Sequence, residues 1–362
     1  MRAGTQKHIP LGSKIWILVV DDSVVIRRLV ARALAEDPAF EVVGTAANGA
    51  IALSKIPQVN PDAVTLDIEM PEMDGLEALR RIRKLYPTLC VIMFSTLTLR
   101  AATHTLDALA LGANDYVTKA ANVGSLNKSM ASLRSQLIPK IKQFFEFEVQ
   151  SAPRASAKPQ AERASIPPRS LPWRKRDIVA IGVSTGGPNA LAEIFPSLPI
   201  RFPCPILIVQ HMPPLFTRML SERLSAQSKV PVEEAAEGTA VEPGKALIAP
   251  GGYHMRLKRS GAQVVATLDQ SPPVNSCRPA VDVLFSSVAE IYGSGALGVI
   301  LTGMGQDGLE GAKQLKAQGA CILAQDKATS VVWGMPGFVV EAGLADAVTG
   351  LDRIAPEILL HV

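Results

Sequence analysis

The chain has 362 residues and a formal net charge of +4, and 48% of its residues are hydrophobic while only 5% are aromatic. This length predicts two or three domains that each bury a core, and the many small aliphatic residues favour α/β packing over a β-sandwich. The modest charge gives no indication of nucleic acid as a partner, and four widely spaced cysteines without metal-binding spacing favour reduced thiols in the cytoplasm.

Residues 1–13 are predicted to form an N-terminal tail. They lack the apolar core of a signal peptide, and no apolar run in the sequence is long enough to span a bilayer. We therefore expect a cytoplasmic protein that does not insert into a membrane.

Residues 14–149 alternate short β-type runs with helical patterns. This alternation predicts a parallel sheet with helices on both faces. The last helical segment is long and is predicted to end near Glu148. The predicted strands are Ile15–Val20, Glu41–Thr45, Ala63–Leu66, Val91–Phe94 and Asp115–Val117.

Acidic side chains follow two of these strands. Asp21 and Asp22 come directly after the first strand, and Asp67 follows the third. Because the carboxyl ends of parallel strands share one edge of a sheet, the three carboxylates should converge, and their repulsion predicts a Mg²⁺ ion among them. Ser95 ends the fourth strand and Lys119 follows the fifth, which adds a hydroxyl and a cation suited to a phosphoryl group on Asp67.

This half closely resembles the response-regulator receiver family over roughly residues 14–140, which implies a flavodoxin-like parallel sheet. The resemblance is carried by Val-Asp21-Asp22-Ser, Asp67-Ile-Glu-Met-Pro71 with Asp74-Gly75, Ser95-Thr96 and Tyr116-Val-Thr-Lys119. It implies that Asp67 accepts phosphate from a chemotaxis-type histidine kinase. It also implies that Asp21, Asp22 and Asp67 bind Mg²⁺ together with the backbone carbonyl of Glu69.

The same resemblance implies a switch in which Ser95 and Tyr116 change position when Lys119 senses the phosphate. Receivers usually have a proline after this lysine, whereas this chain has Ala120. A cis peptide bond is therefore not expected there, so the loop geometry should differ while the phosphoryl chemistry is retained.

Residues 150–176 have a different composition from both halves. Pro, Ala and Ser dominate, apolar periodicity stops, and basic residues far outnumber the single acid Glu162. Such a segment buries too little apolar surface to offset its ordering entropy, which predicts an extended linker. Its basic residues could be solvated or could dock an acidic partner.

Residues 177–362 repeat the α/β alternation, which predicts a second doubly wound, Rossmann-like domain. A hairpin formed by Tyr253–Lys258 and Gln263–Leu268 interrupts the alternation. The predicted parallel strands are Ile178–Val183, Pro205–Val209, Lys245–Ala249, Leu297–Leu301 and Cys321–Ala324.

Three polar residues follow strands of this second sheet. Ser184 lies in a Gly-x-Ser-x-Gly turn after the first strand, His211 follows the second, and Asp307 follows the fourth. A serine lifted out of such a turn can attack a carbonyl if a base and an orienting acid come from neighbouring strands. His254, at the start of the hairpin, is the main competing base.

A dinucleotide site is the alternative interpretation of the same segment. Gly303, Gly305 and Gly308 form a G-x-G-x-x-G pattern after a strand, and Asp326 follows at the spacing of a ribose-binding acid. Against it, Asp307 would place a negative charge where a pyrophosphate must bind. The alternative also leaves the serine and histidine without a role.

The second half resembles the catalytic domain of chemotaxis protein-glutamate methylesterases, the CheB family. The resemblance is carried by Gly-Val-Ser184-Thr-Gly-Gly-Pro, Gln-His211-Met-Pro, Gly-Met304-Gly-x-Asp307-Gly and Ala-Pro-Gly251-Gly-x-His254. It implies hydrolysis of glutamate γ-methyl esters on chemoreceptor helices, and deamidation of receptor glutamines, without a cofactor in the esterase domain.

In the expected mechanism Ser184 is the nucleophile, His211 the base and Asp307 the acid that orients it. The backbone N–H groups of Thr185 and Met304 are the hypothesised oxyanion donors. A receiver joined to an esterase also predicts control by phosphorylation, with the unphosphorylated receiver obstructing the active site in the family pattern.

A receiver followed by a basic linker is also the layout of many DNA-binding regulators. The second half has no compact helix-turn-helix pattern or basic recognition helix, so we expect no nucleic-acid binding. A receiver-regulated adaptor that only binds a partner is the other alternative. The expected state is a monomer.

Overall fold

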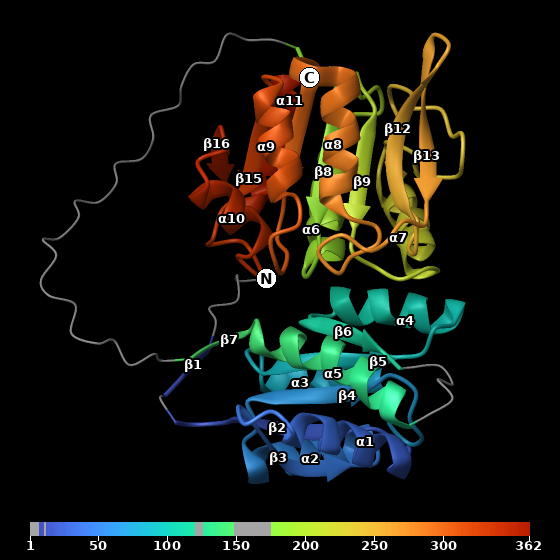
Figure 1. The fold of residues 1–362 in the computed structure, drawn as a ribbon. Helices are drawn as coiled ribbons and strands as arrows, with labels where there is room; N and C mark the ends of the chain where they lie inside the picture. The colour runs from blue at the N-terminus through green and yellow to red at the C-terminus, as the bar shows by residue number, and fades with distance from the viewer. Residues whose placement is uncertain (1–6, 11, 120–125, 148–174) are drawn as a thin grey trace, which may run out of the picture. The chain divides into compact units, whose positions relative to one another are not determined.

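Parallel sheets organise both halves of the chain in the computed structural model, which describes residues 7–10, 12–119, 126–147 and 175–362 (Figure 1). The chain divides into two compact units, whose described residues are 7–147 and 175–362, and each unit is described by itself. Ala120 lies outside the described residues.

The N-terminal unit alternates strands and helices in the order that the sequence predicts. Its helices are α1 (Val24–Ala35), α2 (Gly49–Val59), α3 (Gly75–Leu85), α4 (Leu99–Ala110) and α5 (Leu126–Lys142). Its strands are β1 (Lys7–Ile9), β2 (Ile15–Val20), β3 (Phe40–Ala46), β4 (Ala63–Asp67), β5 (Cys90–Ser95), β6 (Asp115–Thr118) and β7 (Phe145–Phe147).

A five-stranded parallel sheet with the order β3-β2-β4-β5-β6 forms the centre of this unit. Helices α1 and α5 contact each other on one face, while α2, α3 and α4 follow one another on the other. Helices α1 to α4 each begin with a polar side chain that accepts a hydrogen bond from the first turn. These caps are the local reason why the helices start where they do.

Two short strands differ from the prediction. The last helix ends at Lys142 and not near Glu148, because Phe144 and Phe145 turn into the core and the chain continues as β7. Strand β7 pairs in parallel with β1, which lies in the stretch that the sequence indicates as a tail. Both strands have three residues, too few for a pattern to predict.

The C-terminal unit has seven parallel strands and an inserted hairpin. Its strands are β8 (Ile178–Val183), β9 (Ile206–Gln210), β10 (Val232–Glu234), β11 (Ala246–Ile248), β12 (His254–Ser260), β13 (Gln263–Asp269), β14 (Ala296–Ile300), β15 (Cys321–Gln325) and β16 (Ala347–Thr349). Its helices are α6 (Gly187–Ile194), η1 (Phe195–Ser197), α7 (Phe216–Gln227), α8 (Val281–Tyr292), η2 (Gly293–Gly295), α9 (Leu309–Ala317), α10 (Met335–Glu341) and α11 (Leu351–His361).

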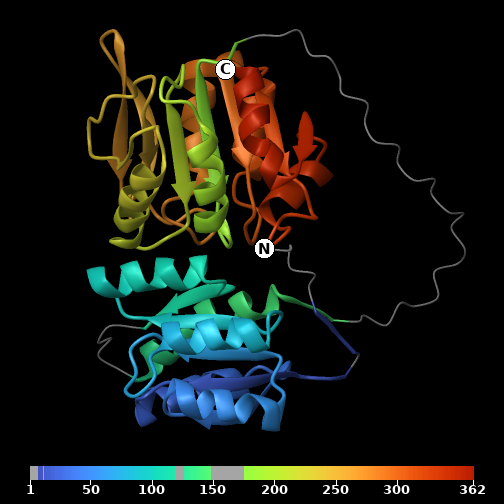
Figure 2. The same cartoon turned by 180° about the vertical axis from the view of Figure 1, so that it is seen from behind.

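The strand order β10-β11-β9-β8-β14-β15-β16 confirms the doubly wound fold. Helices α8 and α9 cover one face of this sheet, and α6 and α7 cover the other (Figures 1 and 2). Strand β8 is fully buried, and the chain runs outward from it in both directions, first through β9 and later through β14. The carboxyl end of β8 is therefore the switch point of the sheet, where ligands of such folds bind.

The predicted linker ends inside the second unit. Arg176 is buried, its backbone N–H donates to the carbonyl of His361 at 2.9 Å, and its guanidinium donates to the carbonyl of Ser294. The rest of the predicted linker up to residue 174 lies outside the described residues. No helix within the described ranges is both long and apolar enough to cross a membrane.

Candidate active site

Ser184 lies at the switch point, directly after β8. Its backbone N–H donates to the carbonyl of Thr302 at 3.0 Å, and its carbonyl accepts a hydrogen bond from the Gln210 amide at 2.9 Å. Gly186 takes a φ of +82° so that the chain can turn into α6. A Cβ at Gly187 would come within 1.9 Å of Gln210 Oε1, so only glycine allows this close approach.

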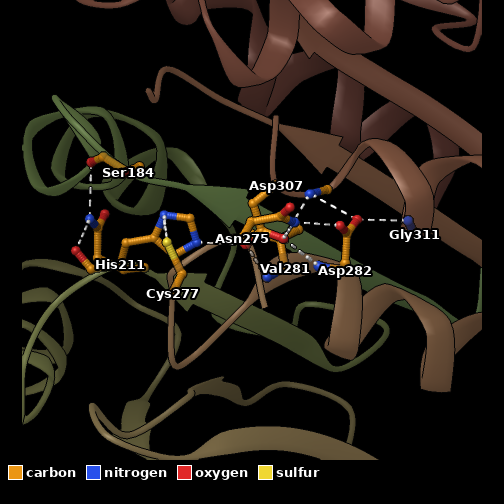
Figure 3. A network of polar contacts seen from close by, with 10 residues as sticks. Ser184, His211, Asn275, Cys277, Val281, Asp282, Asp307 and Gly311 are labelled. Carbon is orange, nitrogen blue, oxygen red and sulfur yellow. Dashed lines mark hydrogen bonds and ion pairs between the residues drawn. The ribbon is translucent and has the colours of Figure 1, made fainter. Parts of the chain in front are cut away.

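His211 follows β9, the neighbour of β8. Its backbone N–H donates to the carbonyl of Val183 at 3.2 Å, and its side chain is only 10% exposed. Nε2 of the imidazole lies 2.7 Å from Oδ2 of Asp307 (Figure 3). Because Nε2 is engaged by the carboxylate, Nδ1 is the nitrogen that can exchange a proton with a substrate group. The thiol of Cys277 lies 3.6 Å from Nδ1.

The Asp307 carboxylate is buried and surrounded by donors. Oδ2 also accepts the backbone N–H of Val281 at 2.6 Å. Oδ1 accepts, each at 3.1 Å, the backbone N–H groups of Asp282 and Gly308 and the side-chain amide of Asn275. Burial alone would raise the pKa of Asp307, but the His211 hydrogen bond and charge and the backbone donors outweigh it and hold this pKa below its usual value.

The pKa of His211 moves in the opposite direction. Burial disfavours the imidazolium, but hydrogen bonds with Asp307 and Cys277 outweigh this and raise the pKa of His211 above its usual value. The pair is therefore arranged to stabilise a proton on the ring after His211 has accepted it.

The three residues that the sequence singles out come from adjacent strand ends. The structure joins His211 to Asp307 directly, whereas in the described part of the chain the hydrogen bonds of Ser184 are made by its backbone. The amide of Gln210 reaches both the Ser184 carbonyl and, at 3.5 Å, the His211 carbonyl, and so ties the serine turn to the histidine strand.

The two hypothesised oxyanion donors come from different loops, the serine turn and the loop after β14. Thr185 is buried, and its carbonyl accepts a hydrogen bond from the Thr302 hydroxyl at 2.9 Å. Met304 is 39% exposed in the loop after β14. Since the N–H of Ser184 is already donated to Thr302, an oxyanion hole here needs N–H groups from other residues.

The geometry argues against the dinucleotide alternative. The N–H groups of Gly308 and Gly311, which a pyrophosphate would need, donate to Oδ1 of Asp282 at 2.9 and 2.7 Å. The carboxylate of Asp326 accepts the N–H of Thr329 at 2.9 Å within its own turn.

The competing histidine, His254, is the first residue of β12 in the inserted hairpin. His254 is fully buried in the hairpin, with Nε2 3.2 Å from the carbonyl of Pro272. It therefore has no exposed face to offer a substrate.

A second polar site occupies the carboxyl edge of the N-terminal sheet. Asp21, Asp22 and Asp67 offer oxygens that all lie within 4.8 Å of one another, and Asp22 is exposed. Lys119 Nζ lies 2.8 Å from Oδ2 of both Asp21 and Asp67.

Burial and the neighbouring carboxylates raise the pKa of Asp67 to about 6 although Lys119 opposes them. Lys119 neutralises only part of the negative charge of these three carboxylates, and Asp22 is open to solvent. Such a cluster suits a hard divalent cation such as Mg²⁺.

The remaining receiver residues surround this site. Ser95 is buried, and its hydroxyl oxygen accepts a hydrogen bond from the hydroxyl of Thr105 in α4 at 2.7 Å. The backbone carbonyl of Ser95 accepts the backbone N–H of Lys119 at 2.7 Å. Tyr116 is also buried, and burial raises the pKa of its hydroxyl. Glu69 is exposed two residues after Asp67.

Sequence reasoning missed four residues around the histidine and the acid. Three of them, Asn275, Cys277 and Asp282, belong to a turn and a helix start after the antiparallel hairpin, where neither a parallel strand end nor a periodic pattern marks them. The fourth, Gln210, is adjacent to His211 and buried at the end of an apolar strand, where a polar residue is a usable signal.

Comparisons with known proteins find relatives of both units of the chain. Family models described as CheB methylesterase and response regulator receiver domain match residues 179–358 and 17–131. A protein-glutamate methylesterase/protein-glutamine glutaminase of Trichodesmium erythraeum is 53% identical and covers 96% of this chain and 99% of its own length.

A protein of the same name from Nocardioides is 49% identical over 95% of this chain and 94% of its own. The crystal structure of the Thermotoga maritima CheB methylesterase catalytic domain matches with a TM-score of 0.51 and 47% identity, and covers 52% of this chain and 100% of that one.

Proposed function

The chain belongs to the CheB methylesterase family and carries a receiver domain, and from this premise we propose that Ser184, His211 and Asp307 perform its ester hydrolysis. The protein is a receiver-regulated protein-glutamate methylesterase and protein-glutamine glutaminase. It removes methyl groups from glutamate γ-methyl esters of chemoreceptors and releases methanol. The observation that carries the assignment of residues is the 2.7 Å contact between His211 and Asp307 beside the Ser184 turn.

In the first step the Ser184 hydroxyl attacks the ester carbonyl while His211 accepts the hydroxyl proton on Nδ1. Asp307 holds the ring through Nε2 and stabilises the imidazolium that forms. The N–H groups of Thr185 and Met304 are proposed to bind the oxyanion, which is commonly worth roughly 10²–10³ in rate for each donor. His211 then protonates the departing methoxide, and methanol leaves an acyl-enzyme.

In the second step His211 accepts a proton from water, which attacks the acyl-enzyme. Ser184 recovers its proton, and a receptor glutamate is released. Deamidation of a glutamine follows the same path with ammonia as the leaving group, so one site serves both reactions named for the relatives.

The receiver supplies the regulation. Asp67 accepts a phosphoryl group from a histidine kinase, proposed to be of the chemotaxis type, and Ser95, Tyr116 and Lys119 respond to it. Asp21, Asp22 and Asp67 would hold Mg²⁺, with the carbonyl of Glu69 as a further proposed ligand. When bound, Mg²⁺ neutralises charge on the phosphoryl oxygens. Lys119, already 2.8 Å from two of the carboxylates, is placed to pair with the phosphoryl group.

The proposed setting is the cytoplasm, where a monomer of this chain meets the methylated helices of chemoreceptors. The catalytic domain is proposed to need no cofactor, since the Ser–His–Asp mechanism uses protein groups throughout. Nucleic acid is not among the proposed partners.

The experiment that tests this function is methanol release from methylated chemoreceptor membranes. The Ser184→Ala variant should lose at least about 10³-fold in rate because it has no nucleophile. Ser260→Ala, which changes an exposed serine on the hairpin, is the matched control and should keep the full rate. Substantial turnover by Ser184→Ala would refute the nucleophile.

A small-molecule phosphodonor tests the regulation in the same assay. It should raise the rate of the unchanged chain in the presence of Mg²⁺ and leave the rate of Asp67→Asn as it was. An equal response of both proteins would exclude Asp67 as the phosphorylated residue.

A further inference from the structure

Helix α8 begins without a capping side chain of its own. Its N-cap residue is Ala280, and the first N–H groups of the helix, those of Val281 and Asp282, donate to the Asp307 carboxylate at 2.6 and 3.1 Å. Asp307 therefore caps α8 from the loop after β14. The partial positive charge of a helix N-terminus stabilises an ionised carboxylate in this position.

Helix α9 is capped in the reverse direction. Its N-cap residue, Gly308, has no side chain to offer, and Oδ1 of Asp282 instead accepts the N–H groups of Gly308 and Gly311 at 2.9 and 2.7 Å. Asp307 and Asp282 thus exchange helix caps between α8 and α9. The arrangement fixes Asp307 but brings two carboxylates close together, and burial together with the Asp307 charge raises the pKa of Asp282.

The side-chain amide of Asn275 lies between these two carboxylates. Its Nδ2 donates to Oδ2 of Asp282 at 2.8 Å and to Oδ1 of Asp307 at 3.1 Å (Figure 3). A terminal amide carries two N–H groups, so one can serve each carboxylate. Asn275 therefore supplies a neutral double donor where two like charges face each other.

A tight turn holds this amide in place. Val274 and Cys277 exchange backbone hydrogen bonds of 3.1 and 2.8 Å, and the two residues between them have φ values of +50° at Asn275 and +63° at Ser276. Two successive positive φ values are those of a type I′ turn. The turn directs Asn275 to the acid and Cys277 to the base, so a single short loop contacts both members of the His211–Asp307 pair.

We infer that Asn275 is a positioning residue of the esterase: its amide separates the Asp282 and Asp307 carboxylates and fixes the rotation of Asp307 that aims His211. The inference rests on the proposed function of the Ser184 site. Asn275 touches no reacting atom and acts through Asp307 alone. Its residue surface is exposed, so water can replace part of its hydrogen bonding, and the effect of losing it should be moderate.

The alternative is that Asn275 is present only because asparagine tolerates a positive φ. Two substitutions separate these explanations. Asn275→Gly keeps the turn and removes the amide, whereas Asn275→Asp keeps the shape and the tolerance of positive φ but replaces a donor by an acceptor facing two carboxylates. If Asn275 serves only to form the turn, both variants should have a kcat close to that of the unsubstituted protein.

A positioning role predicts a different order. Asn275→Gly should lower kcat by roughly fivefold and Asn275→Asp by roughly 30-fold, both with KM within about twofold, because only the orientation of the acid–base pair changes. The double variant Asn275→Asp/Asp282→Asn restores a hydrogen bond between these two positions but not the one to Asp307. It should therefore remain impaired, and full recovery would show that tethering of the loop is the role of Asn275.

The second measurement does not depend on turnover. The proton of His211 between Nε2 and Asp307 should give a low-field NMR resonance that His211→Asn lacks. The inference predicts that this resonance shifts or broadens in Asn275→Gly and Asn275→Asp. It is overturned if Asn275→Gly keeps both the resonance and more than half of kcat.

These outcomes are distinguishable from a failure of the proposed function. If the unchanged chain releases no methanol from methylated receptor, the function fails, while the resonance still reports whether Asn275 orients Asp307. If Asn275→Asp does not fold, Asn275→Gly decides the matter by itself.

Discussion

Two buried aspartates of this chain, Asp67 and Asp307, occupy equivalent places in two parallel sheets and have opposite electrostatic surroundings. Both lie at or beyond the carboxyl end of a strand and are at most 3% exposed. The charged neighbours of Asp67 are one cation, Lys119, and two further carboxylates, and its pKa is raised to about 6, chiefly by burial. Asp307 has donors on both oxygens, and its pKa is lowered.

The difference teaches how a fold assigns chemistry to a residue type. A carboxylate that its surroundings leave under-compensated gains stability from an added cation or from taking up a proton, which suits Asp67 to its proposed role as a Mg²⁺ ligand. A carboxylate already saturated with donors gains nothing from either. Asp307 therefore stays ionised and serves as the fixed partner of His211.

The largest expected effect comes from removing the charge of the saturated aspartate. Asp307→Asn should lower kcat for methanol release by roughly 10³–10⁴-fold, because the ring loses its orienting anion and the imidazolium its stabilisation. The pKa of His211 should fall toward its usual value, since the Asp307 hydrogen bond is the chief influence that raises it. Kinetics and an NMR titration of His211 measure the two effects.

Asp326→Asn is the matched control for this prediction, because Asp326 also follows a strand of the same sheet but binds within its own turn. It should keep the full rate. If Asp307→Asn loses less than tenfold in kcat, Asp307 is not the orienting acid, and its contrast with Asp67 has no catalytic meaning.

The next effect concerns the stability of the under-compensated aspartate. The pKa of Asp67 is higher in the folded state than its ordinary 3.8, so its ionised form costs stability that is absent at low pH and fully present above about pH 6. Asp67→Asn should remove this cost at pH 8. Each pKa unit corresponds to about 1.4 kcal/mol, and since Lys119 also loses a partner we expect a net gain of about 1–2 kcal/mol.

Calorimetry of the full chain without Mg²⁺ measures this gain. The transition of the N-terminal unit should move to higher temperature, and the transition of the catalytic unit is the internal control. Mg²⁺ offsets the destabilisation by ionised Asp67 only in the unsubstituted protein. Adding the metal should therefore reduce the difference in transition temperature between this protein and Asp67→Asn. A destabilised N-terminal unit in Asp67→Asn would show that Lys119 already compensates Asp67 fully.

A smaller effect is expected in the pH dependence of Mg²⁺ binding. Mg²⁺ binds the ionised carboxylate, and Asp67 takes up a proton as the pH falls through about 6. Affinity should therefore fall by roughly tenfold between pH 7 and pH 5, as titration calorimetry of the full chain can measure. In Asp67→Asn this step should be missing, and an unchanged affinity in the native chain at pH 5 would contradict the raised pKa.

The sequence predicts which strand ends carry the residues of each site. It does not predict the hydrogen bonds that join those residues to the rest of the fold. The apolar runs predict the parallel strands, and strand ends therefore place Ser184, His211 and Asp307 on one edge of the sheet. The reciprocal caps of Asp282 and Asp307 could not be predicted, because each joins a side chain to the start of a helix that is distant in sequence.

Which nitrogen of His211 faces the acid is likewise invisible in the sequence. The ring can meet a carboxylate through either nitrogen, and packing in the folded chain selects Nε2. Cys277 escapes prediction for the same reason, since its contact with Nδ1 depends on a turn with two positive φ values.

The smallest expected effect tests this contact of Cys277 with the base. The thiol raises the pKa of His211, so Cys277→Ala should lower that pKa, though by less than Asp307→Asn does, and move the acid limb of kcat/KM to lower pH. The rate near neutral pH should change by no more than roughly threefold, because the Asp307 contact remains.

Cys321→Ala is the control for that variant. This buried cysteine begins β15, whereas His211 follows the carboxyl end of β9, so the substitution should leave the acid limb in place. Asp307 is the chief cause of the raised pKa of His211, and the Cys277 thiol beside the ring only adjusts that pKa. A shift of the acid limb to higher pH in Cys277→Ala would mean that the thiol opposes the protonated ring, and the direction of its influence would have to be reversed.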